Sequence, residues 1–346
     1  MKRMLSAGLR ACMLVALLGL LIYFRFIDLA VLWRILAHPD VLVIGAGAVS
    51  LSYMMAALRW WLLLRSQNFA ITYLHAFRIY LVSIFSAIFV PGGTFSSDAV
   101  RAFMLVRMVP ARRSQALLSL FAESVIAALV LSLLVAILSL AQWPIRQAAS
   151  SDPIIWLNIA ALLLPMALSI TACGAWLITR TAKRRITQSS PNPTRIVRTI
   201  VVVADFFDLA LKSRLIILLA MVASAISLGL LLGAIVIVSM VAAIPNLSFW
   251  DIAYAAALSQ FANSLPISPN GIGVGEAAFN QICVWIAQSN AHYPYATIFL
   301  AYRIIAVLVA CCGGIASLNV RRLMRPVSEQ AYPLMETDVH VQPGNS

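Results

Sequence analysis

Six apolar stretches of this sequence are predicted to cross a lipid bilayer as helices. A hydrocarbon core about 30 Å thick needs about 20 helical residues, and backbone groups inside it cannot bond to water. The chain is 62% hydrophobic and 11% charged, whereas soluble domains are about 45–50% apolar and about 25% charged. We therefore predict an all-α, polytopic integral membrane protein. The six stretches are Ala11–Phe24, Val41–Leu64, Ser114–Leu140, Pro153–Ile178, Leu215–Ile244 and Tyr295–Ala316.

The first stretch is open to two interpretations. It follows a basic start, as the apolar region of a secretory signal peptide would. No small-residue cleavage site follows it, and Arg25 stands where one is expected. We therefore favour an uncleaved first transmembrane helix.

Basic residues are distributed unevenly between the two sides that these spans define. About twenty of the 25 Lys and Arg fall in segments on the side of the N-terminus, and the opposite loops hold Arg34 and Arg146. This pattern predicts a bacterial-type cytoplasmic (inner) membrane protein with both termini in the cytoplasm. Near the end of the second span, Arg59 is expected to extend to the headgroups, beside Trp60 and Trp61 at the interface.

The sequence predicts one transmembrane domain over residues 1–325, followed by a polar, disordered tail at 326–346. A basic, polar stretch at 180–198 is the seam between two halves. Val201–Leu211 is expected to lie on the membrane surface as an amphipathic segment. Scattered histidines and five cysteines show no metal-ligand spacing, and no Walker motif or strand-flanked glycine fingerprint occurs. We expect no cofactor, no metal and no nucleic-acid partner.

Two glycine-rich breaks interrupt shorter apolar stretches, one in each half. Pro91 and Asp98 are seven positions apart in the first break, and Pro269 and Glu276 are seven apart in the second. The first follows Ile79–Val90, which is too short to span comfortably and is expected to be re-entrant. The second follows Asp251–Leu265 and precedes Ala277–Ala287. Paired broken segments favour an inverted-repeat transporter, and two unrelated interfacial loops are the alternative.

Each break can begin a helix inside the protein, where free amides and the helix dipole would attract an anion. Ser96 or Ser97 is a candidate cap for the first such helix. Charged residues beside the breaks would suit a lipid headgroup, with the arginines at its phosphate and the carboxylates at a cation. The alternative is that these charges only pair and lock the bundle. The candidate site residues are Pro91, Gly92, Gly93, Asp98, Arg101, Glu123, Pro269, Asn270, Gly271, Gly273, Gly275, Glu276 and Arg303.

These motifs, followed by Ala301-Tyr302-Arg303 and Gly313-Gly314, resemble the flippase-like transmembrane domain of lysylphosphatidylglycerol synthases over about residues 10–325. In that family a carboxylate like Glu123 is often followed by Arg, whereas Ser124 follows it here. This difference puts an ion pair at that position in question.

The resemblance implies translocation of a phospholipid or isoprenoid-linked lipid between leaflets, with membrane lipids and lipid-pathway enzymes as partners. Lysyltransferase activity is not expected, because the family's soluble catalytic domain has no counterpart among the residues after Arg325. The alternatives are an intramembrane lipid-modifying transferase and a non-transporting scaffold of a lipid or glycan synthesis complex.

Overall fold

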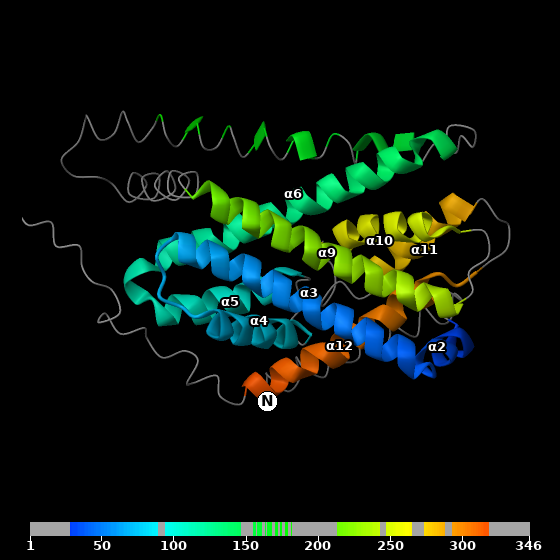
Figure 1. Cartoon of the computed structure of the whole chain (residues 1–346), viewed down its shortest axis with the longest axis horizontal. Helices are drawn as coiled ribbons and strands as arrows, with labels where there is room; N and C mark the ends of the chain where they lie inside the picture. The colour runs from blue at the N-terminus through cyan, green and yellow to red at the C-terminus, as the bar shows by residue number, and fades with distance from the viewer. Residues whose placement is uncertain are drawn as a thin grey trace, which may run out of the picture.

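The computed structural model describes residues 28–88, 94–146, 213–242, 247–264, 273–287 and 293–317, with scattered residues between 155 and 181. All regular structure within these ranges is helical (Figure 1). The helices are α2 (Leu29–Leu36), α3 (Pro39–Ser66), α4 (Tyr73–Ala87), α5 (Thr94–Met108), η1 (Pro110–Arg112), α6 (Arg113–Arg146), α9 (Arg214–Ala242), α10 (Phe249–Ser264), α11 (Val274–Ala287) and α12 (Ala296–Ser317).

Four of the described helices, α3, α6, α9 and α12, are long and apolar enough to cross a membrane. They coincide with the second, third, fifth and sixth predicted spans, so the prediction of a polytopic helical protein is confirmed. The first predicted span lies outside the described residues, and the fourth does so for the most part. The seam, the surface segment and the tail also lie outside them.

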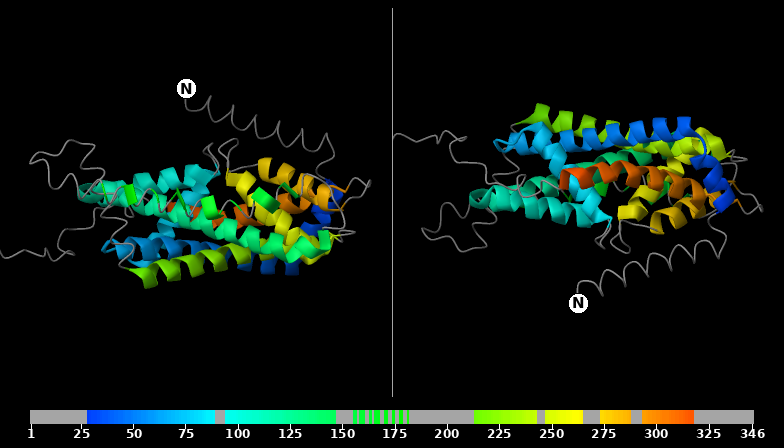
Figure 2. Two further views of the ribbon diagram at one scale, coloured as in Figure 1. Left: turned by 90° about the horizontal axis from the view of Figure 1, so that it is seen from above. Right: turned by 90° about the horizontal axis from the view of Figure 1, so that it is seen from below.

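Four of the shorter helices form two hairpins, α4–α5 and α10–α11, whose arms pack against each other. The first hairpin enters the bundle from the end at which α3 finishes, and the second enters from the opposite end (Figures 1 and 2). Their inner ends approach each other in the middle of the bundle. Each arm has 14 to 16 residues, which at 1.5 Å per residue gives about 21–24 Å and is too short to cross the membrane.

The two halves repeat one arrangement in opposite directions. A long helix, a hairpin and a second long helix follow in order as α3, α4–α5 and α6, and again as α9, α10–α11 and α12. Helices α3 and α9 lie side by side and antiparallel (Figure 1). The last long helix of each half packs on the first hairpin arm of the other half, α12 on α4 and α6 on α10. This is the arrangement of an inverted repeat.

Small residues allow these helices to approach closely. A Cβ added to Gly313 of α12 would lie 2.2 Å from the carbonyl oxygen of Leu81 in α4, so only glycine fits there. Between α3 and α9, the Ser52 hydroxyl donates to the Ser227 carbonyl oxygen at 2.8 Å, and the Ser227 hydroxyl donates to the Ser52 carbonyl oxygen at 2.9 Å. Such residues hold helices together in lipid, where no hydrophobic force drives them together.

Candidate functional site

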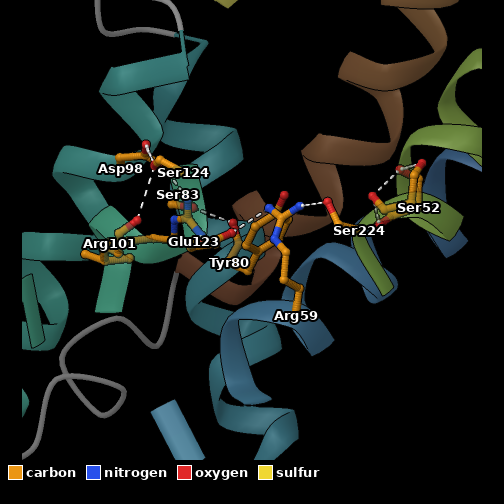
Figure 3. A network of polar contacts seen from close by, with 11 residues as sticks. Ser52, Arg59, Tyr80, Ser83, Asp98, Arg101, Glu123, Ser124 and Ser224 are labelled. Carbon is orange, nitrogen blue, oxygen red and sulfur yellow. Dashed lines mark hydrogen bonds and ion pairs between the residues drawn. The ribbon is translucent and has the colours of Figure 1, made fainter. Parts of the chain in front are cut away.

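A four-residue charge cluster joins α3, α5 and α6 inside the first half (Figure 3). Glu123 of α6 is at its centre and is only 1% exposed. Its two carboxylate oxygens lie 2.8 Å from Nη2 of Arg59 and 2.5 Å from Nη1 of Arg101. Arg101 also pairs with Asp98, three residues earlier on α5. The second amino group of Arg59 donates to the Ser224 hydroxyl on α9 at 3.0 Å.

The formal charges of this cluster sum to zero, which is what a buried site requires. An unpaired ion at the centre of a membrane helix costs about 2.5–3.5 kcal/mol on insertion scales. Arg101 also lies 5.4 Å from the ring centroid of Trp60 and 5.0 Å from that of Tyr80, positions suited to cation–π attraction. Asp98 is the exposed edge of the cluster, with a side chain 27% exposed. Its second oxygen accepts from the Ser124 hydroxyl at 3.2 Å.

A second buried ion pair joins α11 and α12 in the other half. Glu276 is fully buried, and its Oε1 lies 2.6 Å from Nε of Arg303. Its Oε2 accepts the backbone N–H of Gly273 at 2.8 Å, so a carboxylate in the first turn of α11 bonds back to the residue before that helix, as in a capping box. Arg303 also donates to Oδ1 of Asn263, on α10, at 2.9 Å. Arg303 thus links the long helix α12 to both arms of the hairpin.

Two glycines are needed for this geometry. Gly273 has φ of 87°, a left-handed conformation that costs other L-residues about 1–2 kcal/mol. A Cβ on Gly275 would lie 2.9 Å from Cε1 of Phe299 and 3.1 Å from Nη2 of Arg303. A side chain there would therefore push against the arginine that pairs with Glu276.

The two sites correspond under the repeat, with their charges exchanged. In each half the ion pair joins the second hairpin arm to the long helix that follows it. The arm carries Arg101 and the long helix carries Glu123 in the first half. The arm carries Glu276 and the long helix carries Arg303 in the second half.

Tyrosines lie between the two charged sites. The Tyr53 and Tyr80 rings contact edge to face, with centroids 6.4 Å apart. The Arg101 guanidinium lies 5.0 Å from the Tyr80 ring centroid, and the Tyr53 hydroxyl donates to the Ala306 carbonyl oxygen of α12 at 3.5 Å. Tyr302 adjoins Arg303 in sequence and packs on the Phe299 ring, with centroids 5.6 Å apart. Aromatic rings from both halves therefore lie between the two ion pairs.

A family model described as the lysylphosphatidylglycerol synthase TM region matches residues 9–314. The chain belongs to this family. The match includes both hairpins and both ion pairs, and it confirms the resemblance that the sequence motifs indicated. No curated protein and no solved structure matches the chain.

In this member of the lysylphosphatidylglycerol synthase TM family, the structure brings the predicted site residues Asp98, Arg101 and Glu123 into one cluster. Gly273, Gly275, Glu276 and Arg303 form the second. The remaining candidates lie outside the described residues and stay predictions: Pro91, Gly92, Gly93, Pro269, Asn270 and Gly271. No group of three potential metal ligands occurs in the described part of the chain.

Three expectations need correction. Arg59 does not extend to the headgroups, because its guanidinium is held inside by Glu123, and the side chain is only 9% exposed. Trp60 is fully buried instead of lying at an interface. Ser96 and Ser97 lie within the first turn of α5, which begins at Thr94, so neither precedes the helix as a cap.

The family difference at Ser124 does not abolish ion pairing at Glu123. Two arginines from other helices satisfy this carboxylate. Ser124 instead donates to Asp98 at the edge of the cluster. The sequence offered one signal for Arg59, a charge within an apolar span, and none for the tyrosines, whose spacing is that of ordinary packing residues.

Proposed function

We propose that the protein moves an anionic or zwitterionic phospholipid between the leaflets of the cytoplasmic membrane. The observation that carries this proposal is the pair of hairpins that enter from opposite ends, each tied by a buried ion pair to the long helix after it. Transporters built from inverted repeats bind their substrates where broken helices from the two halves meet. The family, a membrane domain of lipid-synthase proteins, agrees with a lipid substrate.

A lipid headgroup carries the charges that this interior already pairs. Its phosphate suits Arg101 or Arg303, and an ammonium group suits Asp98, Glu123 or Glu276. The phosphate and ammonium of a zwitterionic headgroup would replace both partners of an existing pair, so no ion would be left unpaired during passage. The acyl chains would remain in the surrounding lipid. No enzymatic step is required, and we propose transport without transfer.

The charge distribution at the helix ends supports an orientation. One end of the bundle holds the finish of α3 and α5 and the start of α6 and α9 (Figure 1). Its arginines include Arg65, Arg107, Arg113 and Arg214. The opposite end holds Asp28, Asp40 and Asp251 with Arg34. By the positive-inside rule the first of these ends faces the cytoplasm.

Reconstitution with a fluorescent phospholipid tests the proposal. In proteoliposomes, dithionite quenches only outer-leaflet label, so a transporter raises the quenched fraction above that of protein-free liposomes. We expect this rise for the wild type and a slower rise for Glu276→Gln, which removes the charge that pairs with Arg303. Asp40→Asn, an exposed change at the start of α3, is the matched control. Transport is refuted if wild type and Glu276→Gln both match protein-free liposomes.

A further inference from the structure

A groove of about 510 Å³ lies where α5 turns through η1 into α6, away from both ion-pair sites. Its walls include Phe103 and Arg107 of α5 and Arg113 and Leu117 of α6, with Ala102 among the lining residues. The volume lies within the range of about 300–1,000 Å³ that small-ligand sites occupy.

Two arginines at this groove have no acidic partner among the residues that the structure describes. Arg107 and Arg113 are exposed. The Arg107 guanidinium lies 4.3 Å from the ring centroid of Phe103, which holds it at the groove by cation–π attraction. On α5 and α6 the described carboxylates are Asp98 and Glu123, and both pair with Arg101. The groove therefore carries two positive charges available to an anion.

Arg112, which lies between Arg107 and Arg113 in the sequence, differs from both because it has hydrogen-bond partners among the described residues. Arg112 of η1 donates to the Gln67 carbonyl oxygen at 2.8 Å and lies over the Phe69 ring. It also donates to Gln115. Arg112 thus fastens the end of α3 to the α5–α6 corner, whereas its neighbour Arg113 has no such contact within the described chain.

Apolar side chains extend from the groove toward the hydrocarbon. Phe103 is 53% exposed and Leu117 is 48% exposed. One turn further along α6, on the face of Arg113 and Leu117, Phe121 is 63% exposed. Because α6 is long and apolar enough to cross the membrane, we expect its first turn at headgroup depth, with Leu117 and Phe121 deeper in the hydrocarbon.

From this arrangement we infer that the groove is a binding site for an anionic phospholipid. The phosphate lies between Arg107 and Arg113, and an acyl chain runs over Phe103, Leu117 and Phe121. Basic pockets between transmembrane helices on the cytoplasmic side bind such headgroups. A free phosphate would use the arginines and leave the apolar wall uncovered, so the lipid is the ligand that fits both parts. Binding here requires no transport, and it stands apart from the proposed function.

Binding at this site can be measured with spin-labelled phosphatidylglycerol, which is added to the full chain in phosphatidylcholine nanodiscs. The fraction of label whose motion is restricted reports the bound lipid. We expect the wild type to bind it more tightly than spin-labelled phosphatidylcholine. Arg107→Gln/Arg113→Gln should weaken the binding by at least about tenfold. Ala102→Trp, which fills the groove and keeps both charges, should also reduce it. Arg78→Gln, an exposed arginine on α4 outside the groove, should leave it unchanged.

The inference is overturned if the double variant binds phosphatidylglycerol as the wild type does, or if Arg78→Gln weakens binding equally. It is also overturned if inorganic phosphate at millimolar concentration displaces the labelled lipid, since the site would then recognise a free anion. Lipid binding that persists without any dithionite-measured translocation would support this site while refuting the proposed transport.

Discussion

Replacing Glu123 by Gln should strongly destabilise the first half of the bundle. The carboxylate is 1% exposed and bonds to Arg59 at 2.8 Å and to Arg101 at 2.5 Å. After the change Arg101 keeps the negative charge of Asp98, but Arg59 keeps only neutral acceptors such as the Ser224 hydroxyl. Removing one partner of a buried pair costs about 3–5 kcal/mol, because the other charge stays buried without compensation.

Thermal unfolding of the purified protein in detergent measures this loss. At about 2–4 °C per kcal/mol, we expect Glu123→Gln to lower Tm by on the order of 10 °C. The double variant Arg59→Met/Glu123→Gln also removes the unpaired charge of Arg59. It should recover part of the lost Tm, because Arg101 and Asp98 then balance each other. Asp40→Asn, exposed at the start of α3, is the control and should lower Tm far less, since a charge in the first turn of a helix is worth only about 0.3–1 kcal/mol.

The double-mutant cycle decides whether this reasoning is correct. Residues that share an ion pair show a coupling energy of about 0.5–3 kcal/mol, whereas independent residues give additive losses. If the losses of stability in Arg59→Met and Glu123→Gln simply add in the double variant, the two charges are not coupled. The argument that each buried charge compensates the other is then wrong.

The remaining predictions concern helix contacts. Gly313→Ala should lower Tm, because its Cβ would meet the Leu81 carbonyl oxygen at 2.2 Å and overpacking costs about 1–3 kcal/mol. Gly229→Ala, with open space around it, should not lower Tm. Equal losses in the two variants would contradict the packing argument. Ser52→Ala and Ser227→Ala should show a coupling of about 0.6 kcal/mol in a denaturation cycle; a coupling of zero would mean that their shared bonds add no net stability.

Four of the six predicted spans and the two re-entrant elements agree with the described helices, because length and hydropathy determine what crosses a bilayer. The partners of the charges could not be predicted in the same way. Arg59 lies within a helix that is apolar on nearly all sides, so its sequence does not show which face meets Glu123. That pairing depends on α3 packing against both α6 and α9. The positions of Tyr53, Tyr80 and Tyr302 could not be predicted either, because they lie between the charged sites only as a result of how the two halves pack.

The pairing of charges within each half explains why a charged interior is compatible with stability. A buried network is tolerated when every charge in it has a partner. Arg101 with Glu123, and Glu276 with Arg303, each satisfy this condition within one half. Either half could therefore loosen while the other remains closed and neutral. Independently balanced halves would meet the condition that the proposed transport places on an inverted repeat, which is to open at one end at a time.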